Sequence, residues 1–138
     1  MAPESIQGEP LAGSQLHSAI SNALVHLYRD YLGRGPSRVR TSLRDNVLVV
    51  IMEDTLTKAE RSLARDGKEG EVLEVRQSFQ RTMRHDMVEA VERLSGRRVI
   101  AFMSANHIDP DLASETFVFE ARPGDDPEGE AVDVVDRA

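Results

Sequence analysis

The strongest indication of the fold of this chain is the stretch LGRGPSRVRTSLRDNVLVVIMED, residues 32–54. Gly33 can adopt the left-handed conformation that ends a helix, and Pro36 cannot continue one. Polar and apolar residues then alternate over 38–44, which is typical of a strand with one solvent-exposed face. After the turn residues RDN, segment 47–52 is apolar on both faces and rich in β-branched residues. The stretch therefore predicts a helix end followed by an antiparallel hairpin.

Helical patterns lie on both sides of this hairpin. Upstream, apolar residues recur at three- and four-residue spacing after Ser14, which predicts an amphipathic helix of roughly 18 residues. Downstream, Thr57 with Glu60 three residues later has the capping-box pattern and predicts a short helix over 56–66. A longer helix is expected over about 69–94, because one stripe there is apolar: Val72, Val75, Phe79, Met83, Met87, Val91 and Leu94.

Two further strands are predicted in RRVIAFMSANHI and ETFVFEAR, joined by the loop DPDLAS. The expected order is α-β-β-α-α-β-β. It predicts an α+β single domain, with a four-stranded, mostly antiparallel sheet and the helices on one face. The two helix-plus-hairpin units indicate either an internal duplication or the common placement of a hairpin after a helix. Both readings lead to the same sheet.

The composition of the chain indicates how it divides into folded and disordered parts. The 138 residues suffice for one domain. The net charge of −7 comes from the ends, since acids and bases balance over 14–122. We expect a folded domain over 14–122 between a disordered N-terminal extension, 1–13, and an acidic disordered tail, 123–138. The N-terminus lacks a secretory signal, and no apolar run approaches the roughly 18 residues of a spanning helix, so a cytoplasmic location is expected.

A basic cluster follows the first helix, and no acid occurs within 33–44. By strand parity, Arg38, Arg40 and Arg44 lie on one face of the hairpin. Guanidinium groups suit phosphate, carboxylate or an acidic protein surface. Nucleic acid is not expected, because the cluster contains no stacking aromatic residues and the chain is acidic. The predicted partner- or anion-binding residues are Arg34, Gly35, Arg38, Arg40 and Arg44.

These arginines have an alternative, structural reading. Arg38 and Arg40 can pair across the sheet with Glu53 or Glu120, in which case the cluster would be a solvated sheet edge. The sequence leaves both readings open.

No catalytic set, cofactor or metal site is predicted. The chain has no cysteine, and its glycines fit neither a phosphate-binding loop nor a dinucleotide fingerprint. His85 and Glu89, four apart on the long helix with Asp86 between them, suit two metal ligands or an acid and base, but two ligands do not make a site. Another group surrounds one loop without the glycine and oxygen series of a calcium loop: His107, Asp109, Asp111 and Glu115.

The long helix suggests self-association. A helix over 69–94 spans on the order of 38 Å at 1.5 Å per residue, which is longer than a domain of this size comfortably covers. Either it kinks or its end packs on another subunit. We therefore expect a homodimer whose interface includes Phe79, Met83 and Met87.

The stretch from residue 32 to 79 resembles the MpsC-like family of small bacterial proteins, formerly a domain of unknown function. That family is named for a Na⁺-translocating, membrane-potential-generating system, and the resemblance covers roughly residues 15–121. It implies association with cation- or bicarbonate-coupled transport machinery and supplies no catalytic residues. The residues that carry it are Gly33, Gly35, Pro36, Asp45, Leu56, Thr57, Glu60, Gly70, Arg76, Gly96 and the closing FVFE.

Three hypotheses follow. The leading one is a soluble, non-enzymatic accessory or regulatory protein that contacts an acidic partner, such as a membrane transport protein, through the arginine face without inserting into the membrane. The second is a small-anion or nucleotide sensor that uses the same arginines with the GRGP backbone amides. The third is an enzyme with His85 and Glu89 as acid and base.

Overall fold

The structure is a computed structural model, and it describes residues 11–123, 125 and 132–134. Most of the expected N-terminal extension, 1–13, and most of the expected acidic tail, 123–138, lie outside the described residues.

The described part of the chain folds in the predicted order, α-β-β-α-α-β-β, and the α+β single-domain prediction is confirmed. The sheet is entirely antiparallel, with strand order β1-β2-β4-β3. The elements are α2 (Gly13–Leu32), β1 (Arg38–Arg44), β2 (Val47–Glu53), α3 (Lys58–Arg65), α4 (Glu69–Ser95), β3 (Val99–His107) and β4 (Leu112–Phe119).

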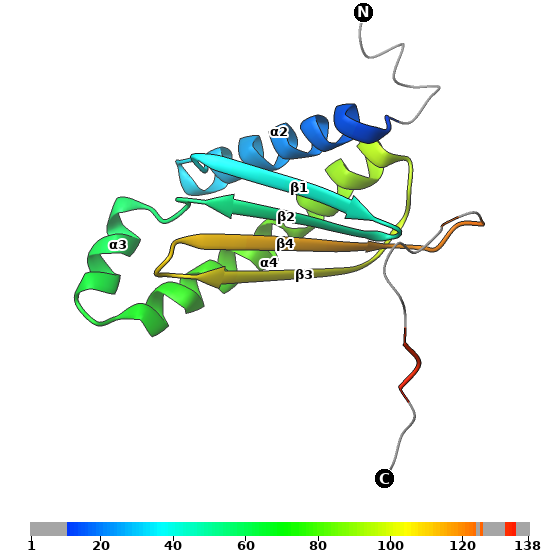
Figure 1. The fold of residues 1–138 in the computed structure, drawn as a ribbon. Helices are drawn as coiled ribbons and strands as arrows, with labels where there is room; N and C mark the ends of the chain where they lie inside the picture. The colour runs from blue at the N-terminus through cyan, green and yellow to red at the C-terminus, as the bar shows by residue number, and fades with distance from the viewer. Residues whose placement is uncertain (1–10, 124, 126–131, 135–138) are drawn as a thin grey trace, which may run out of the picture.

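The two long helices pack side by side behind the sheet, as Figure 1 shows. Both lie on the same face, with α2 against the β1 side and α4 against the β3 side. The described residues place no helix on the opposite face. We call that opposite face the open sheet face.

Most local signals of the sequence act as expected, although α2 begins after Ala12 and Ser14 does not cap it. Gly33 ends α2 with φ 80°, and its amide donates to the carbonyl oxygen of Arg29 at 2.9 Å. Thr57 and Glu60 form the capping box at the start of α3, where each side chain accepts a hydrogen bond from the other residue's backbone N–H. Asp45 takes φ 58° in the tight turn between β1 and β2.

The core lies between the helices and the sheet. Alternate residues of β2 and β4 point into it, including Leu48, Val50 and Phe117, all fully buried. The rings of Phe102 and Phe117 lie 4.9 Å apart, centroid to centroid. The helices contribute Ile20, Leu24, Met83 and Met87.

Helix α4 is continuous over its 27 residues. Its C-terminal half packs on the sheet, whereas its N-terminal half leads toward α3 and passes the end of the strands with its first turns (Figure 1). Three apolar side chains of that half therefore remain partly exposed: Leu73 at 41%, Val75 at 42% and Phe79 at 36%.

Candidate functional site

The predicted arginines lie along β1 and in the loop before it. Arg38, Arg40 and Arg44 occupy exposed, alternate positions of the strand. Thr41 points the other way, and its hydroxyl lies 2.6 Å from the hydroxyl of Ser21 in α2. The three strand arginines therefore project from the open sheet face, along the edge formed by β1.

Arg34 and two of the strand arginines meet acids of their own domain. A nitrogen of the Arg34 guanidinium lies 2.7 Å from a carboxylate oxygen of Asp54. The Nε atoms of Arg38 and Arg40 lie 3.8 and 4.0 Å from the same oxygen, Oε2 of Glu53. The alternative pairing with Glu53 is thus present, whereas Glu120 lies 4.0 Å from Arg98 instead.

The pairing with Glu53 is weak by geometry. A single carboxylate serves two guanidinium groups at the long end of the ion-pair range. The side chains of Arg38 and Arg40 are 67% and 60% exposed, and such surface pairs contribute about 0–1 kcal/mol. The β1 edge therefore keeps an excess of positive charge that remains accessible.

Apolar side chains occupy the middle of the open sheet face. Strand register places Arg44, Val47 and Val118 beside one another across β1, β2 and β4. In the next rows of this face, Val49 and Ile51 lie opposite polar residues of β4, and Met103 of β3 is 55% exposed. The face therefore combines an apolar centre with a row of guanidinium groups along one edge.

The GRGP loop has a mainly structural role in this geometry. The backbone amides of Gly33 and Ser37 already donate to the carbonyl oxygens of Arg29 and Glu53. A Cβ atom on Gly35 would lie 3.3 Å from Cγ1 of Val25, so this glycine lets the loop pack closely on α2. Few loop amides are left to bind an anion.

The three residues predicted for a dimer interface do not lie on one surface of the fold. Met83 and Met87 are fully buried in the core of their own domain. Phe79 is the one with an accessible ring, near Val75 one turn earlier on α4.

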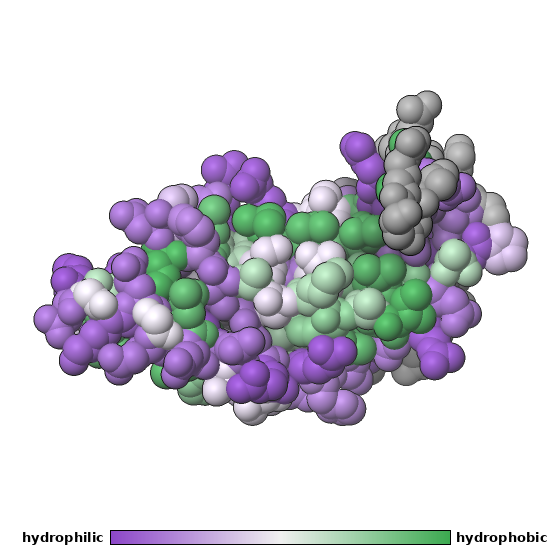
Figure 2. Space-filling view, turned by 90° about the horizontal axis from the view of Figure 1, so that it is seen from below, coloured by the Kyte–Doolittle hydropathy of each residue, from purple (hydrophilic) through white to green (hydrophobic). Residues whose placement is uncertain are grey.

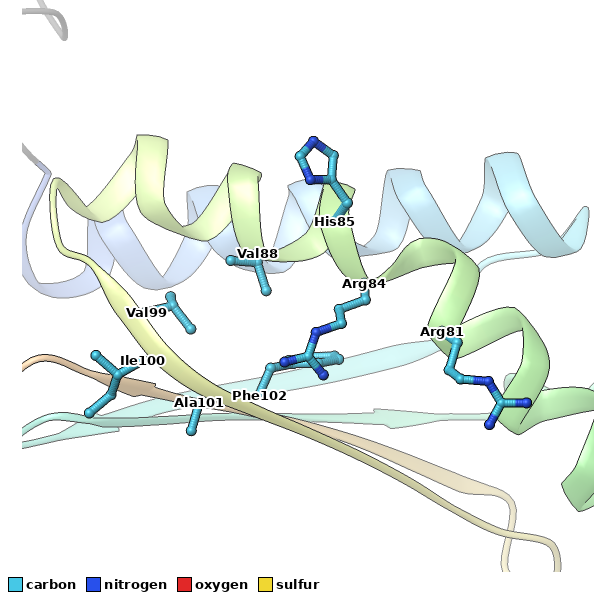
Figure 3. Close-up of a pocket in the computed structure, with 8 residues that line it drawn as sticks. All are labelled: Arg81, Arg84, His85, Val88, Val99, Ile100, Ala101 and Phe102. Atoms are coloured by element: carbon cyan, nitrogen blue, oxygen red, sulfur yellow. The ribbon is translucent and has the colours of Figure 1, made fainter.

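A groove between α4 and β3 was not predicted from the sequence. It has a volume of about 370 Å³ and includes Arg81, Arg84, Val88, Ile100 and Phe102 among its lining residues. Figure 2, which views the molecule from the β3 side, shows hydrophobic residues gathered in the middle of this face with hydrophilic residues around them. In Figure 3 the Arg84 side chain extends from α4 toward β3, and its guanidinium carbon lies 5.3 Å from the centre of the Phe102 ring.

His85 and Glu89 do not converge on one site. The His85 ring points away from β3 (Figure 3), at the border of the α4–β3 groove. Glu89 borders a different hollow, between α2 and α4, and lies 3.6 Å from the Arg93 guanidinium. Their arrangement therefore offers no shared substrate position for an acid and a base.

The side chains near the β3–β4 loop also diverge. Asp111 accepts hydrogen bonds from the amides of Thr55 and Leu56, whereas Glu115 points into the core. His107 Nδ1 lies 2.8 Å from the carbonyl oxygen of Pro110. Among the described residues, no group of three or more His, Cys, Asp or Glu side chains is arranged to hold a metal ion.

A buried ion pair joins α3 to α4. Arg76 is 1% exposed and donates to both carboxylate oxygens of Glu60, at 2.8 and 2.7 Å. It also donates to the hydroxyl and carbonyl oxygens of Thr55. Burial opposes ionisation of Glu60, but hydrogen bonds from Arg76 and Thr57 and the charge of Arg76 outweigh it and hold the pKa of Glu60 below its usual value.

A second buried carboxyl lies on β4. Glu115 is fully buried and accepts hydrogen bonds from the hydroxyls of Tyr28 and Ser104. Burial raises the pKa of Glu115 to about 7, against the opposing effect of these two hydroxyls and of the charge on Arg76. Burial, followed by the neighbouring Glu115, also raises the pKa of Tyr28.

The sequence held a partial signal for both carboxyls. Arg76 interrupts the apolar stripe of the long helix one turn after Val72, where a cation is costly without a partner. Glu115 alternates with Ala113 and Phe117, which places it on the core face of its strand. Their partners come from distant segments, so periodicity alone could not identify them.

Together, these features define a small α+β domain with a partly apolar, arginine-bordered open sheet face. Within the described residues, no helix is long and apolar enough to cross a membrane.

Residues 13–121 match the family model described as Na⁺-translocating membrane potential-generating system (MpsC), and the chain belongs to this family. This confirms the resemblance noted from the turn, capping-box and Arg76 positions. A search among curated proteins finds no match to the chain, and a search among solved structures finds none either.

Proposed function

We propose that the chain is a non-enzymatic accessory protein of a membrane cation-translocating system, and that its open sheet face binds an acidic partner. The observation that carries the proposal is the composition of that face: an apolar centre across β2 and β4 beside Arg38, Arg40 and Arg44 on β1. The family description supplies the link to a membrane system.

The chemistry of the face defines the partner. Apolar contact across Val49, Ile51 and Met103 would supply most of the binding free energy. Carboxylates at the border would pair with Arg38 and Arg40 and fix the orientation of the complex. The partner is therefore a protein surface with an apolar centre and acids along one side. A cytoplasmic location stays a prediction.

A photo-crosslinking residue at Ser42 tests this proposal. Ser42 is exposed between Arg40 and Arg44 on the open sheet face. We expect crosslinks in cells to a subunit of a membrane transport system, identified by mass spectrometry. The matched position is Ser62, exposed on α3 and away from the sheet. Equal products from both positions would contradict the proposal.

A charge-reversal variant tests the arginines. Changing Arg34, Arg38 and Arg40 to Glu should abolish the Ser42 crosslinks, once the variant is shown to fold. The control carries the same change of charge at other exposed arginines: Arg65, Arg93 and Arg98. If a small anion were the ligand instead, phosphate would raise the melting temperature of the natural chain and no protein would be crosslinked.

Self-association is part of the same proposal. The exposed Val75 and Phe79 supply apolar surface on the N-terminal half of α4 that a second copy can cover. We expect a dimer mass in light scattering at tens of micromolar, and a monomer mass for Phe79→Glu. A monomeric natural chain at that concentration would refute the dimer.

A further inference from the structure

The free edge of β3 has little of the usual protection of an edge strand, apart from a register shift between Val99 and Ala101. β3 is the last strand of the sheet, and its nine residues contain no Lys, Arg, Asp, Glu or Pro. Edge strands in native proteins are commonly shielded by charges, proline or covering segments, because their unpaired N–H and C=O groups can recruit another strand. Ile100 on β3 is 58% exposed. This edge is suited to bind an extended segment.

The groove beside this edge is positively charged. Arg81 and Arg84 border the hollow next to Val99–Phe102 and also the adjoining hollow next to Ser104. No acidic side chain lines either hollow, and neither arginine forms an ion pair with a described residue. The occupant should therefore be an extended segment that carries both carboxylates and apolar side chains.

A second copy fits this edge poorly. Antiparallel pairing of two β3 strands about a two-fold axis would bring the Arg81 and Arg84 groups of both copies toward each other. With no acid in the groove to compensate, the like charges would repel.

The chain itself contains a matching segment. Residues 130–136 read EAVDVVD, in which an acid recurs at every third residue with Ala and Val between them. In an extended segment, Asp133 lies on the opposite face from Glu130 and Asp136. Val132 and Val134 are 77% and 90% exposed in the structure, so neither apolar side chain is covered.

The same segment starts close to the groove. Asp125 accepts a hydrogen bond at 2.9 Å from the buried guanidinium of Arg97, two residues before β3 begins. From Asp125 to residue 130 the chain can span about 17 Å when extended. A segment that begins at residue 130 can therefore reach the Val99 end of the groove.

We propose that residues 130–136 bind in the α4–β3 groove, along the free edge of β3, with Asp133 facing Arg81 and Arg84. The segment would complete the sheet as a fifth strand and cover Ile100. This binding is independent of the function proposed for the open sheet face, which lies on other residues.

Hydrogen–deuterium exchange tests the contact. The full chain is compared with a chain truncated after residue 127, which keeps the Asp125 anchor. We expect β3 amides to exchange about fivefold more slowly in the full chain, because added strand pairing protects them. Equal exchange of the β3 amides in the two chains would overturn the proposal.

Charge reversal keeps the test specific. Asp133→Lys should remove the protection, as should Arg81→Glu with Arg84→Glu, and combining all three changes should restore it. The control, Arg65→Glu with Arg93→Glu, makes the same change of charge outside the groove and should leave protection intact. Failure of the three-fold variant to restore protection, or protection that grows with protein concentration, would overturn binding within one chain.

Discussion

Glu60 and Glu115 are both buried carboxyls, yet their surroundings drive their ionisation in opposite directions. Glu60 faces the guanidinium of Arg76 and has a lowered pKa. Glu115 faces two hydroxyls, and its pKa is raised to about 7. Burial disfavours both carboxylates, so the partner decides the charge. One small core therefore holds one carboxyl ionised and lets the other change its charge near pH 7.

The difference follows from where α4 meets the other elements. Arg76 lies on the part of α4 that packs against α3, and its fork reaches both oxygens of Glu60. Glu115 lies on β4, beneath α2, and meets Tyr28 from that helix. Arg76 acts on Glu115 only through its charge, without a hydrogen bond.

The largest predicted effect comes from removing Arg76, the cation that faces Glu60. Arg76→Met should lower the free energy of unfolding by about 3–5 kcal/mol, because it leaves Glu60 buried without a compensating charge. Urea unfolding at pH 7 measures this loss.

A double variant separates charge from packing. Glu60→Gln removes the acid charge and keeps an oxygen that can accept from the Thr57 amide. Combined with Arg76→Met, it should lose less stability than Arg76→Met alone. If the losses of the two single variants simply add, the ion pair is not the cause.

The second effect is a pH dependence from Glu115. Its pKa rises from 4.5 in the unfolded chain to about 7 in the folded one. The folded state therefore keeps a proton that the unfolded state releases, so stability falls as pH rises from 4.5 to 7 and levels off above it. A shift of this size corresponds to on the order of 3 kcal/mol. Unfolding free energies from pH 4.5 to 8 give the measurement.

Glu115→Gln provides the control for that slope. The amide has a similar shape and does not titrate, so the decline between pH 4.5 and 7 should disappear. Glu60 contributes in the opposite sense and in another window, since its lowered pKa makes stability fall only as pH drops below about 4.5. A decline that persists in Glu115→Gln would assign the slope to other groups.

A smaller effect is expected from one of the two hydroxyls. Tyr28→Phe removes a donor to Glu115 and should cost about 1 kcal/mol. Because that hydrogen bond favours the carboxylate, its loss should also move the pH window of Glu115 upward. The same pH series on the variant checks both points. An unmoved window would mean that the Tyr28 hydroxyl does not contribute to the pKa of Glu115.

The sequence predicted those parts of the fold that depend on local signals. Gly33 with Pro36 ended the helix, and Thr57 with Glu60 placed the next one, because caps and turns depend on residues close in the chain. The alternating strands fixed which residues face the helices.

Contacts between distant segments explain what the sequence did not predict. The partners of Arg76 and Glu115 come from segments more than ten residues away. The α4–β3 groove depends on how a helix lies over an edge strand, and no residue pattern encodes that. The apolar stripe of α4 predicted the same role for Phe79 and Met83. In the structure Met83 is buried and Phe79 is 36% exposed, and this difference depends on where the helix meets the sheet.

The smallest effect is expected at a third carboxyl, that of Glu53, which lies near two arginines but at the surface. Glu53→Gln should change the unfolding free energy by no more than about 1 kcal/mol, because water screens the pairs with Arg38 and Arg40. Urea unfolding at low salt and at 0.5 M salt measures this change in free energy. At 0.5 M salt the screening length falls to on the order of 4 Å, so the small difference should vanish. A loss near that of Arg76→Met would instead make the β1 arginines structural, since guanidinium groups held that strongly by their own domain are not available to a partner.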